Sequence, residues 1–79
     1  MKLRQIASNM TELTVNGNEV LFSYETPVAA FVFSRGYVRT ATHYSPTTSR
    51  HINKWLNGFV AEEVPQEFIN ELLNINEGE

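Results

Sequence analysis

Apolar and polar residues alternate along the first part of the chain with the period of two that is typical of β-strands. Between Thr11 and Val15 every second side chain is apolar, and the pair Asn16-Gly17 that follows is a strong signal for a two-residue hairpin turn. The alternation resumes over residues 19–25. The pattern therefore predicts two antiparallel strands joined by a tight turn.

Two further strands are predicted after this hairpin. Residues 28–34 (VAAFVFS) are apolar on both faces, which suits either a strand covered on two sides or one at a dimer contact. A turn at Arg35-Gly36 leads into a fourth strand over residues 37–43. Residues 2–7 (KLRQIA) fit an edge strand or a short helix, and the pattern does not distinguish them.

After the fourth strand the hydrophobic period becomes that of a helix. Several hydroxyl side chains offer N-caps, and Ile52, Trp55 and Leu56 stand at i, i+3 and i+4. A helix is predicted over about residues 47–57, ending where Gly58 takes the left-handed conformation. Trp55 is assigned to the core or to an interface.

A second helix is predicted over about residues 65–74. Pro65 suits a first helical turn, and the glutamates around it lie near the positive end of the helix dipole. The buried stripe of this helix is predicted at Phe68, Ile69, Leu72 and Leu73. Beyond Ile75 the chain is expected to fray.

This order of elements predicts an α+β fold. We expect an antiparallel four-stranded β-meander over about residues 10–44, followed by two α-helices packed on one face of the sheet. A chain of 79 residues has room for a single domain, residues 1–79. It has no cysteine, so disulfides cannot reinforce the small core, and a homodimer is the expected supplement.

Charge is unevenly distributed along the chain. The net charge is −3, yet residues 26–61 carry four basic residues and no acidic one, whereas residues 62–79 carry six glutamates and no base. No apolar stretch reaches the length of a membrane span, and the first residues lack the apolar core of a signal peptide. The expected location is the cytoplasm, with no membrane partner.

Candidate catalytic residues are few. The chain lacks the common nucleophile, phosphate-binding and zinc-protease motifs. His43 and His51 are separated by a short segment and could meet, but two histidines alone make a poor metal site. The glutamates around the second helix are explained by solvation and by the dipole. We therefore expect a protein that is not an enzyme and holds no metal or cofactor.

Two surfaces are candidates for binding a partner. The first is a basic and aromatic tract, and the second is the acidic face of the last helix. Such a basic and aromatic mixture suits single-stranded nucleic acid, but Tyr and Arg also anchor protein interfaces, and the overall acidity disfavours a polyanion. The basic tract comprises Arg35, Tyr37, Arg39, His43, Arg50, His51 and Lys54, and the acidic face comprises Glu63, Glu67 and Glu71.

Two segments, TTSRHINKWL and EEVPQEF, resemble a family of short phage-encoded proteins of unknown function. The stretches RQIASNMTELT and VLFSYETPVAA are similar to the same family, so the resemblance covers nearly the whole chain. It supplies no catalytic residues. It implies an accessory protein made during infection, among which non-enzymatic inhibitors of host defence or restriction are common.

The function expected from these observations is that of a small non-enzymatic accessory protein that binds and modulates or inhibits a host protein. The partner would be a defence or nucleic-acid-processing protein in the host cytoplasm. The alternative is a nucleic-acid-binding regulator that uses the surface of Arg39, Arg50 and Lys54.

Overall fold

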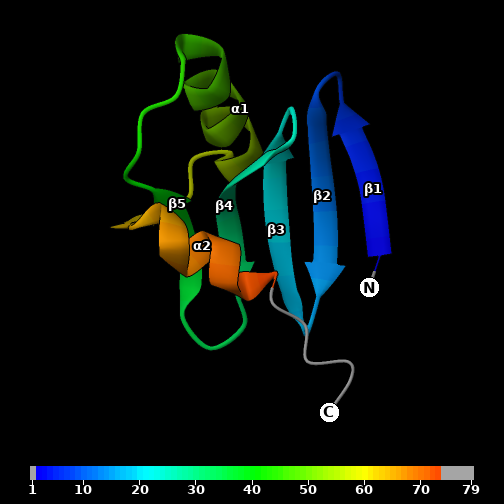
Figure 1. Cartoon of the computed structure of the whole chain (residues 1–79), viewed down its shortest axis with the longest axis vertical. Helices are drawn as coiled ribbons and strands as arrows, with labels where there is room; N and C mark the ends of the chain where they lie inside the picture. The colour runs from blue at the N-terminus through cyan, green and yellow to red at the C-terminus, as the bar shows by residue number, and fades with distance from the viewer. Residues whose placement is uncertain (1, 74–79) are drawn as a thin grey trace.

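A computed structural model describes residues 2–73 and shows a six-stranded sheet with two helices (Figure 1). The strands lie in the sheet in their order along the chain. They are β1 (Lys2–Ala7), β2 (Met10–Val15), β3 (Asn18–Ser23), β4 (Thr26–Val32), β5 (Gly36–Thr40) and β6 (Glu62–Val64), and the helices are α1 (Pro46–Leu56) and α2 (Gln66–Leu72).

The predicted α+β class and the four predicted antiparallel strands are confirmed, but the sheet is larger than expected. The segment left open at residues 2–7 is a strand, β1, paired antiparallel with β2. Strand β6, which pairs parallel with β5, is not predicted from the sequence pattern. Its three residues are too few to show a period, and Glu62 and Glu63 are expected near the start of a helix. The predicted end of α2 at residue 74 lies outside the described residues.

The turn and cap residues take the conformations that their types favour. Asn16 and Gly17 have φ of 53° and 80°, as a two-residue type I′ hairpin requires. Ser45 caps α1 by accepting a hydrogen bond from the backbone N–H of Thr48 at 3.1 Å. Asn57, with a φ of 51°, closes the helix in the left-handed conformation. The predicted hairpin and first helix are therefore confirmed.

The two helices lie on opposite faces of the sheet, and the expectation that both pack on one face is wrong. Figure 1 shows α2 in front of the sheet and α1 behind it. Helix α1 forms the crossover between the parallel strands β5 and β6, so it must cross one face, and the chain after β6 then covers the other. The core is correspondingly split into two clusters.

This arrangement explains why the strand predicted at residues 28–34 is apolar on both faces. Ala29 packs in the cluster of Ile52 on α1, whereas Ala30 packs in the cluster of Ile69 on α2. Both sides of β4 are therefore covered within one chain, which is the first of the two alternatives stated above. The homodimer stays a prediction, but this strand no longer argues for it.

No helix among the described residues is both long and apolar enough to cross a bilayer.

Candidate binding site

A cleft of about 350 Å³ opens on the face of the sheet that carries α1, between that helix and the first two strands. We call it the α1-face cleft. It is lined by Arg4, Ile6, Ala7, Met10, Glu12, Glu19, Tyr37, Lys54 and Trp55. The cleft therefore has an apolar and aromatic floor with charged side chains around it.

The strand period brings these residues to one face. Arg4, Glu12 and Leu21 are register partners on β1, β2 and β3, so their side chains project on the same side of the sheet. Leu21 is buried under α1, whereas the first two strands extend beyond the helix. The cleft exists because α1 covers only the middle of a sheet that is wider than the helix.

Glu12 is the best-anchored charge in the cleft. Arg4 Nη2 donates to Glu12 Oε1 at 3.0 Å, and Trp55 Nε1 donates to Glu12 Oε2 at 2.8 Å. The side chain of Glu12 is 13% exposed, against 67% for Arg4. One carboxylate thus joins β1, β2 and α1, and it fixes the orientation of both Arg4 and the indole ring.

An aromatic cluster forms the other side of the cleft. The ring of Tyr37 lies 5.6 Å from that of Trp55 and 4.9 Å from that of Phe31, both edge to face. Phe59 stacks on Tyr37 at 5.1 Å with an interplanar angle of 19°. Phe59 is 60% exposed and the following Val60 is 92% exposed, so the cluster continues to the surface.

A second, smaller hollow of about 180 Å³ adjoins the cleft along β1 and β2. It is lined by Lys2, Arg4, Glu12, Thr14 and Glu19. Because three of these residues also line the α1-face cleft, the two hollows form one continuous depression. Charges of both signs border it, so its electrostatic character is mixed rather than uniformly basic.

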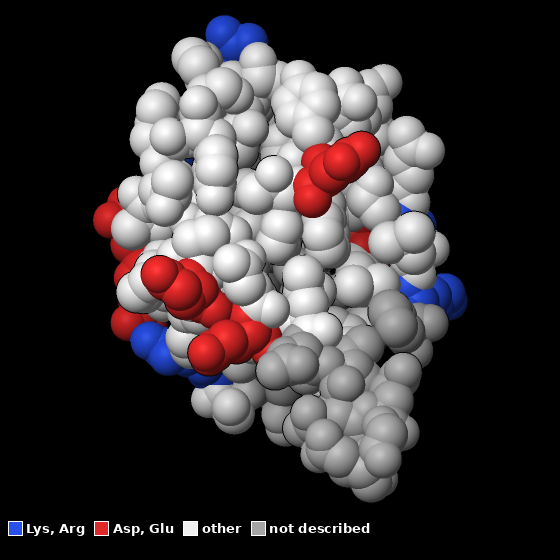
Figure 2. Space-filling model, viewed as in Figure 1, with Lys and Arg blue, Asp and Glu red and all other residues white. Residues whose placement is uncertain are grey.

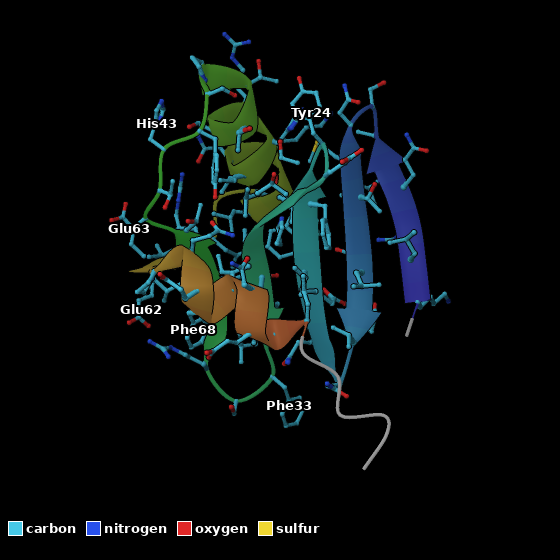
Figure 3. The ribbon with its side chains drawn as sticks, viewed as in Figure 1. Tyr24, Phe33, His43, Glu62, Glu63 and Phe68 are labelled. Carbon is cyan, nitrogen blue, oxygen red and sulfur yellow. The ribbon has the colours of Figure 1, made fainter. Side chains whose placement is uncertain are left out.

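The residues of the predicted basic tract lie on different faces of the sheet. Tyr37 and Lys54 line the α1-face cleft, and Arg39 lies on the same face, where its Nη1 donates to Asn53 Oδ1 of α1 at 3.2 Å. Arg50 is exposed on α1. His43 lies exposed in the segment before α1 (Figure 3).

Arg35 belongs to the opposite face. Its Nε and Nη2 donate to the two carboxylate oxygens of Glu62 at 3.1 and 2.9 Å, and its guanidinium lies 4.6 Å from the centre of the Phe68 ring on α2. The hydrogen bond with Glu62 raises the pKa of Arg35, and the same bond and the positive charge lower the pKa of Glu62. Arg35 therefore joins β6 and α2 to the β4–β5 turn.

The predicted acidic residues are all exposed, on β6 and on the outer side of α2. Figure 2 shows acidic groups gathered over this part of the molecule, and Figure 3 labels Glu62 and Glu63 there. Glu67 and Glu71 stand four apart on α2. Glu67 and Glu71 thus lie on the side of the sheet opposite the α1-face cleft, whereas Glu63 is the register partner of Arg39 and projects toward the α1 face.

His51 takes part in a hydrogen-bonded group that the sequence did not indicate. Ser23 Oγ lies 2.7 Å from His51 Nδ1 and 3.1 Å from Thr48 Oγ1. A serine beside a histidine is the first requirement of an activated nucleophile. Ser23, however, is only 2% exposed, so a substrate has no access to its hydroxyl. The arrangement fastens α1 to β3.

The two predicted histidines do not belong to a cluster of metal-binding side chains within the described residues. Among residues 2–73 no group of three or more His, Asp or Glu side chains is placed to hold a metal ion.

The residues of this site that are not predicted from the sequence include six that line the cleft and two of the aromatic cluster. They are Arg4, Ile6, Ala7, Met10, Glu12 and Glu19 in the cleft, and Phe31 and Phe59 in the cluster. The signal for Glu12 was present, since it alternates with Thr11 and Leu13 on a predicted strand and so projects to the opposite face. Its partner Arg4 could be found only if residues 2–7 were read as a strand. Phe59 lies in a loop, where no period marks its direction.

Comparison with known proteins gives a family and no function. No curated protein and no solved structure matches the chain. A family model described as a family of unknown function, DUF8033, matches residues 1–71, which include every strand and nearly all of both helices. The chain therefore belongs to this family of unknown function.

Proposed function

We propose that this protein is a non-enzymatic binding module whose α1-face cleft holds part of a protein partner. The observation that carries the proposal is the combination of Tyr37, Trp55 and Arg4 around one depression. These three residue types contribute most of the binding energy at protein interfaces, particularly where they are already held in place.

The site is preorganised for such a contact. Trp55 is fixed by its bond to Glu12, and Tyr37 is held between Trp55 and Phe59. Side chains that are rigid before binding lose little conformational entropy on binding. The exposed Phe59 supplies apolar surface that a partner can cover.

The kind of partner follows from the resemblance to short phage-encoded proteins. On that basis the partner is a host protein of the cytoplasm, such as a component of a defence or restriction system, and binding modulates or inhibits it. The exposed glutamates of α2 remain available as a second contact, including toward a surface that normally holds nucleic acid.

A matched pair of phenylalanines allows a direct test. Phe59→Ser removes exposed apolar surface from the site, and Phe33→Ser removes it from the β4–β5 turn, where Phe33 is 79% exposed. Each variant and the unmodified protein, tagged at the C-terminus, would be used for quantitative capture from host lysate. We expect one protein to be enriched by the unmodified chain and by Phe33→Ser, and to be lost with Phe59→Ser.

Two results would contradict the proposal. Equal enrichment by all three proteins would show that the α1-face cleft is not the contact. Loss of the enrichment after nuclease treatment of the lysate would show that nucleic acid is the partner, which is the alternative suggested by Arg39 and Lys54 beside the aromatic cluster.

A further inference from the structure

We infer that β1 is an addition site for an extended acidic segment of the partner, which joins the sheet as a further strand beside the α1-face cleft. This inference rests on the proposed function, since it names how the partner of that cleft is held. Strand addition at a sheet edge is a common mode of peptide recognition, with backbone bonds giving affinity and alternate side chains giving specificity.

The first observation is that β1 is a long and open edge. Within the described part of the chain it pairs with β2 on one side and with no strand on the other. Lys2, Leu3, Arg4 and Gln5 are all exposed, and the strand contains no proline. An edge strand of this kind presents a row of free backbone N–H and C=O groups to an incoming chain.

The second observation is the charge of this edge. Lys2 and Arg4 are the only charged residues of β1, and both project toward the α1 face, where they border the smaller hollow. Arg4 already lies across from Glu12 on β2. Acidic side chains on the incoming strand would continue the same alternation of charge from strand to strand, and opposite charges on neighbouring strands stabilise a pair.

On the α2 face of β1, an exposed side chain favours an apolar residue in the incoming strand. Leu3 projects to the α2 face, where it is 68% exposed beside its register partner Leu13. An incoming strand that alternates acidic and apolar residues therefore matches both faces of β1. The pattern of the expected segment is acidic, apolar, acidic.

A second copy of this chain fits the edge less well. Antiparallel pairing of two β1 strands would bring the lysine and the arginine of both copies together without any acid on either strand. The other edge, β6, is acidic but only three residues long, and Glu62 on it is already bonded to Arg35. A separate acidic segment can pair along residues 2–5 of β1, which precede the irregularity in register between Gln5 and Ala7.

The test uses labelled peptides and isotope-labelled protein of unmodified sequence. One peptide alternates glutamate and valine, a second alternates lysine and valine, and a third is the glutamate peptide N-methylated at every second residue. We expect the glutamate peptide to bind about tenfold more tightly than the lysine peptide at low salt, because two cross-strand charge pairs change sign. Its binding should shift the backbone amide resonances of β1, and N-methylation should abolish it.

Two charge reversals separate the edge from the rest of the α1 side. Lys2→Glu changes β1, whereas Arg50→Glu makes the same change of charge at an exposed position of α1 that does not line the cleft. We expect Lys2→Glu to abolish the preference between the two peptides, because β1 then carries one base and one acid, and Arg50→Glu to keep it.

The inference is overturned if the glutamate and lysine peptides bind alike, if neither binds, or if the N-methylated peptide binds as well as its parent. Sedimentation that shows self-association of the unmodified protein, with β1 amide resonances that shift as the protein concentration rises, would also overturn it, in favour of a second copy. In any of these cases, the proposed function would still be supported if Phe59→Ser loses the captured partner. A failure of the β1 inference can therefore be distinguished from a failure of the proposed function.

Discussion

Glu12 is the residue on which the charge arrangement of the cleft depends. It accepts a hydrogen bond from Arg4 and another from Trp55. In the ion pair of Arg4 and Glu12, the side chain of Glu12 is the less exposed. A charge that is nearly buried is stable only while its partners are present. The exposed arginine, in contrast, is solvated whether or not it is paired.

This difference predicts unequal effects of two alanine substitutions. Glu12→Ala leaves the indole N–H without an acceptor and should lower the free energy of unfolding by about 2 kcal/mol. Arg4→Ala should lower it by less than about 1 kcal/mol, as for other exposed ion pairs. Urea denaturation followed by the fluorescence of Trp55, the single tryptophan of the chain, measures both. Equal losses would mean that the Trp55 bond contributes little.

Among single residues, the sequence identified those whose type alone is informative. Tyr37 and Lys54 were predicted as binding candidates, and both line the cleft. Trp55 was predicted as a core or interface residue, and it packs against the α1-side core cluster. The pairing of Glu12 with Arg4 depends on strand register, which no single segment specifies.

At the level of elements, the position of α1 on the sheet is specified by a small polar group. Ser23 on β3 lies within hydrogen-bond distance of both Thr48 and His51, and Thr48 in turn receives a bond from the Ser45 hydroxyl. Buried polar groups that are mutually bonded favour one packing arrangement over others. This group therefore fixes how the helix sits, and with it the shape of the cleft.

Removing one side chain of this hydrogen-bonded group should weaken the attachment of α1 to β3. Ser23→Ala leaves His51 Nδ1 without its Ser23 partner and removes one of the two hydrogen bonds of the Thr48 hydroxyl, and it should cost about 1.5 kcal/mol of stability. Ser34→Ala, at an exposed position in the β4–β5 turn, is the matched control and should change stability by less than about 0.5 kcal/mol. Thermal unfolding monitored by circular dichroism compares them. A Ser23→Ala protein as stable as the control would show that apolar packing alone holds α1.

The elements themselves were predictable to the extent that each has a period of its own. Both helices and strands β2 to β5 were predicted from alternation, caps and turn residues. Strand β6 was missed because its pairing is with β5, more than twenty residues earlier, and three residues carry no pattern. The opposite placement of the helices follows from that parallel pair, so missing β6 led to the wrong arrangement.

Considered whole, the molecule has two chemically different sides. The α1 side holds the aromatic cleft and its mixed charges, while the α2 side carries exposed glutamates and the Arg35–Glu62 pair. That ion pair is the contact between β6 and the β4–β5 turn. Its contribution to the attachment of the last strand depends on pH, whereas the backbone pairing with β5 and the burial of Val64 do not.

The sign of this dependence follows from the lowered pKa of Glu62. A carboxyl whose pKa is lower in the folded protein adds stability above its ordinary pKa, about 4.3, and loses it as the pH falls through the lowered value. The stability of the unmodified protein relative to Glu62→Gln should therefore shrink in that acidic range. Urea titrations at a series of pH values test this. When Arg35 is also replaced by Gln, the difference in stability between the protein with Glu62 and the protein with Glu62→Gln should no longer depend on pH.

The agreement between strand order and chain order has a consequence for how the molecule folds. Each of the first five strands finds its partner in the segment next to it, so these contacts close short loops and form quickly. The parallel pairing of β6 is the exception, because α1 must be in place before the strand ends can meet. Folding should thus begin with the hairpins formed by β1 to β5. The acidic edge strand β6 should be the last strand to join the sheet and the first to detach from it.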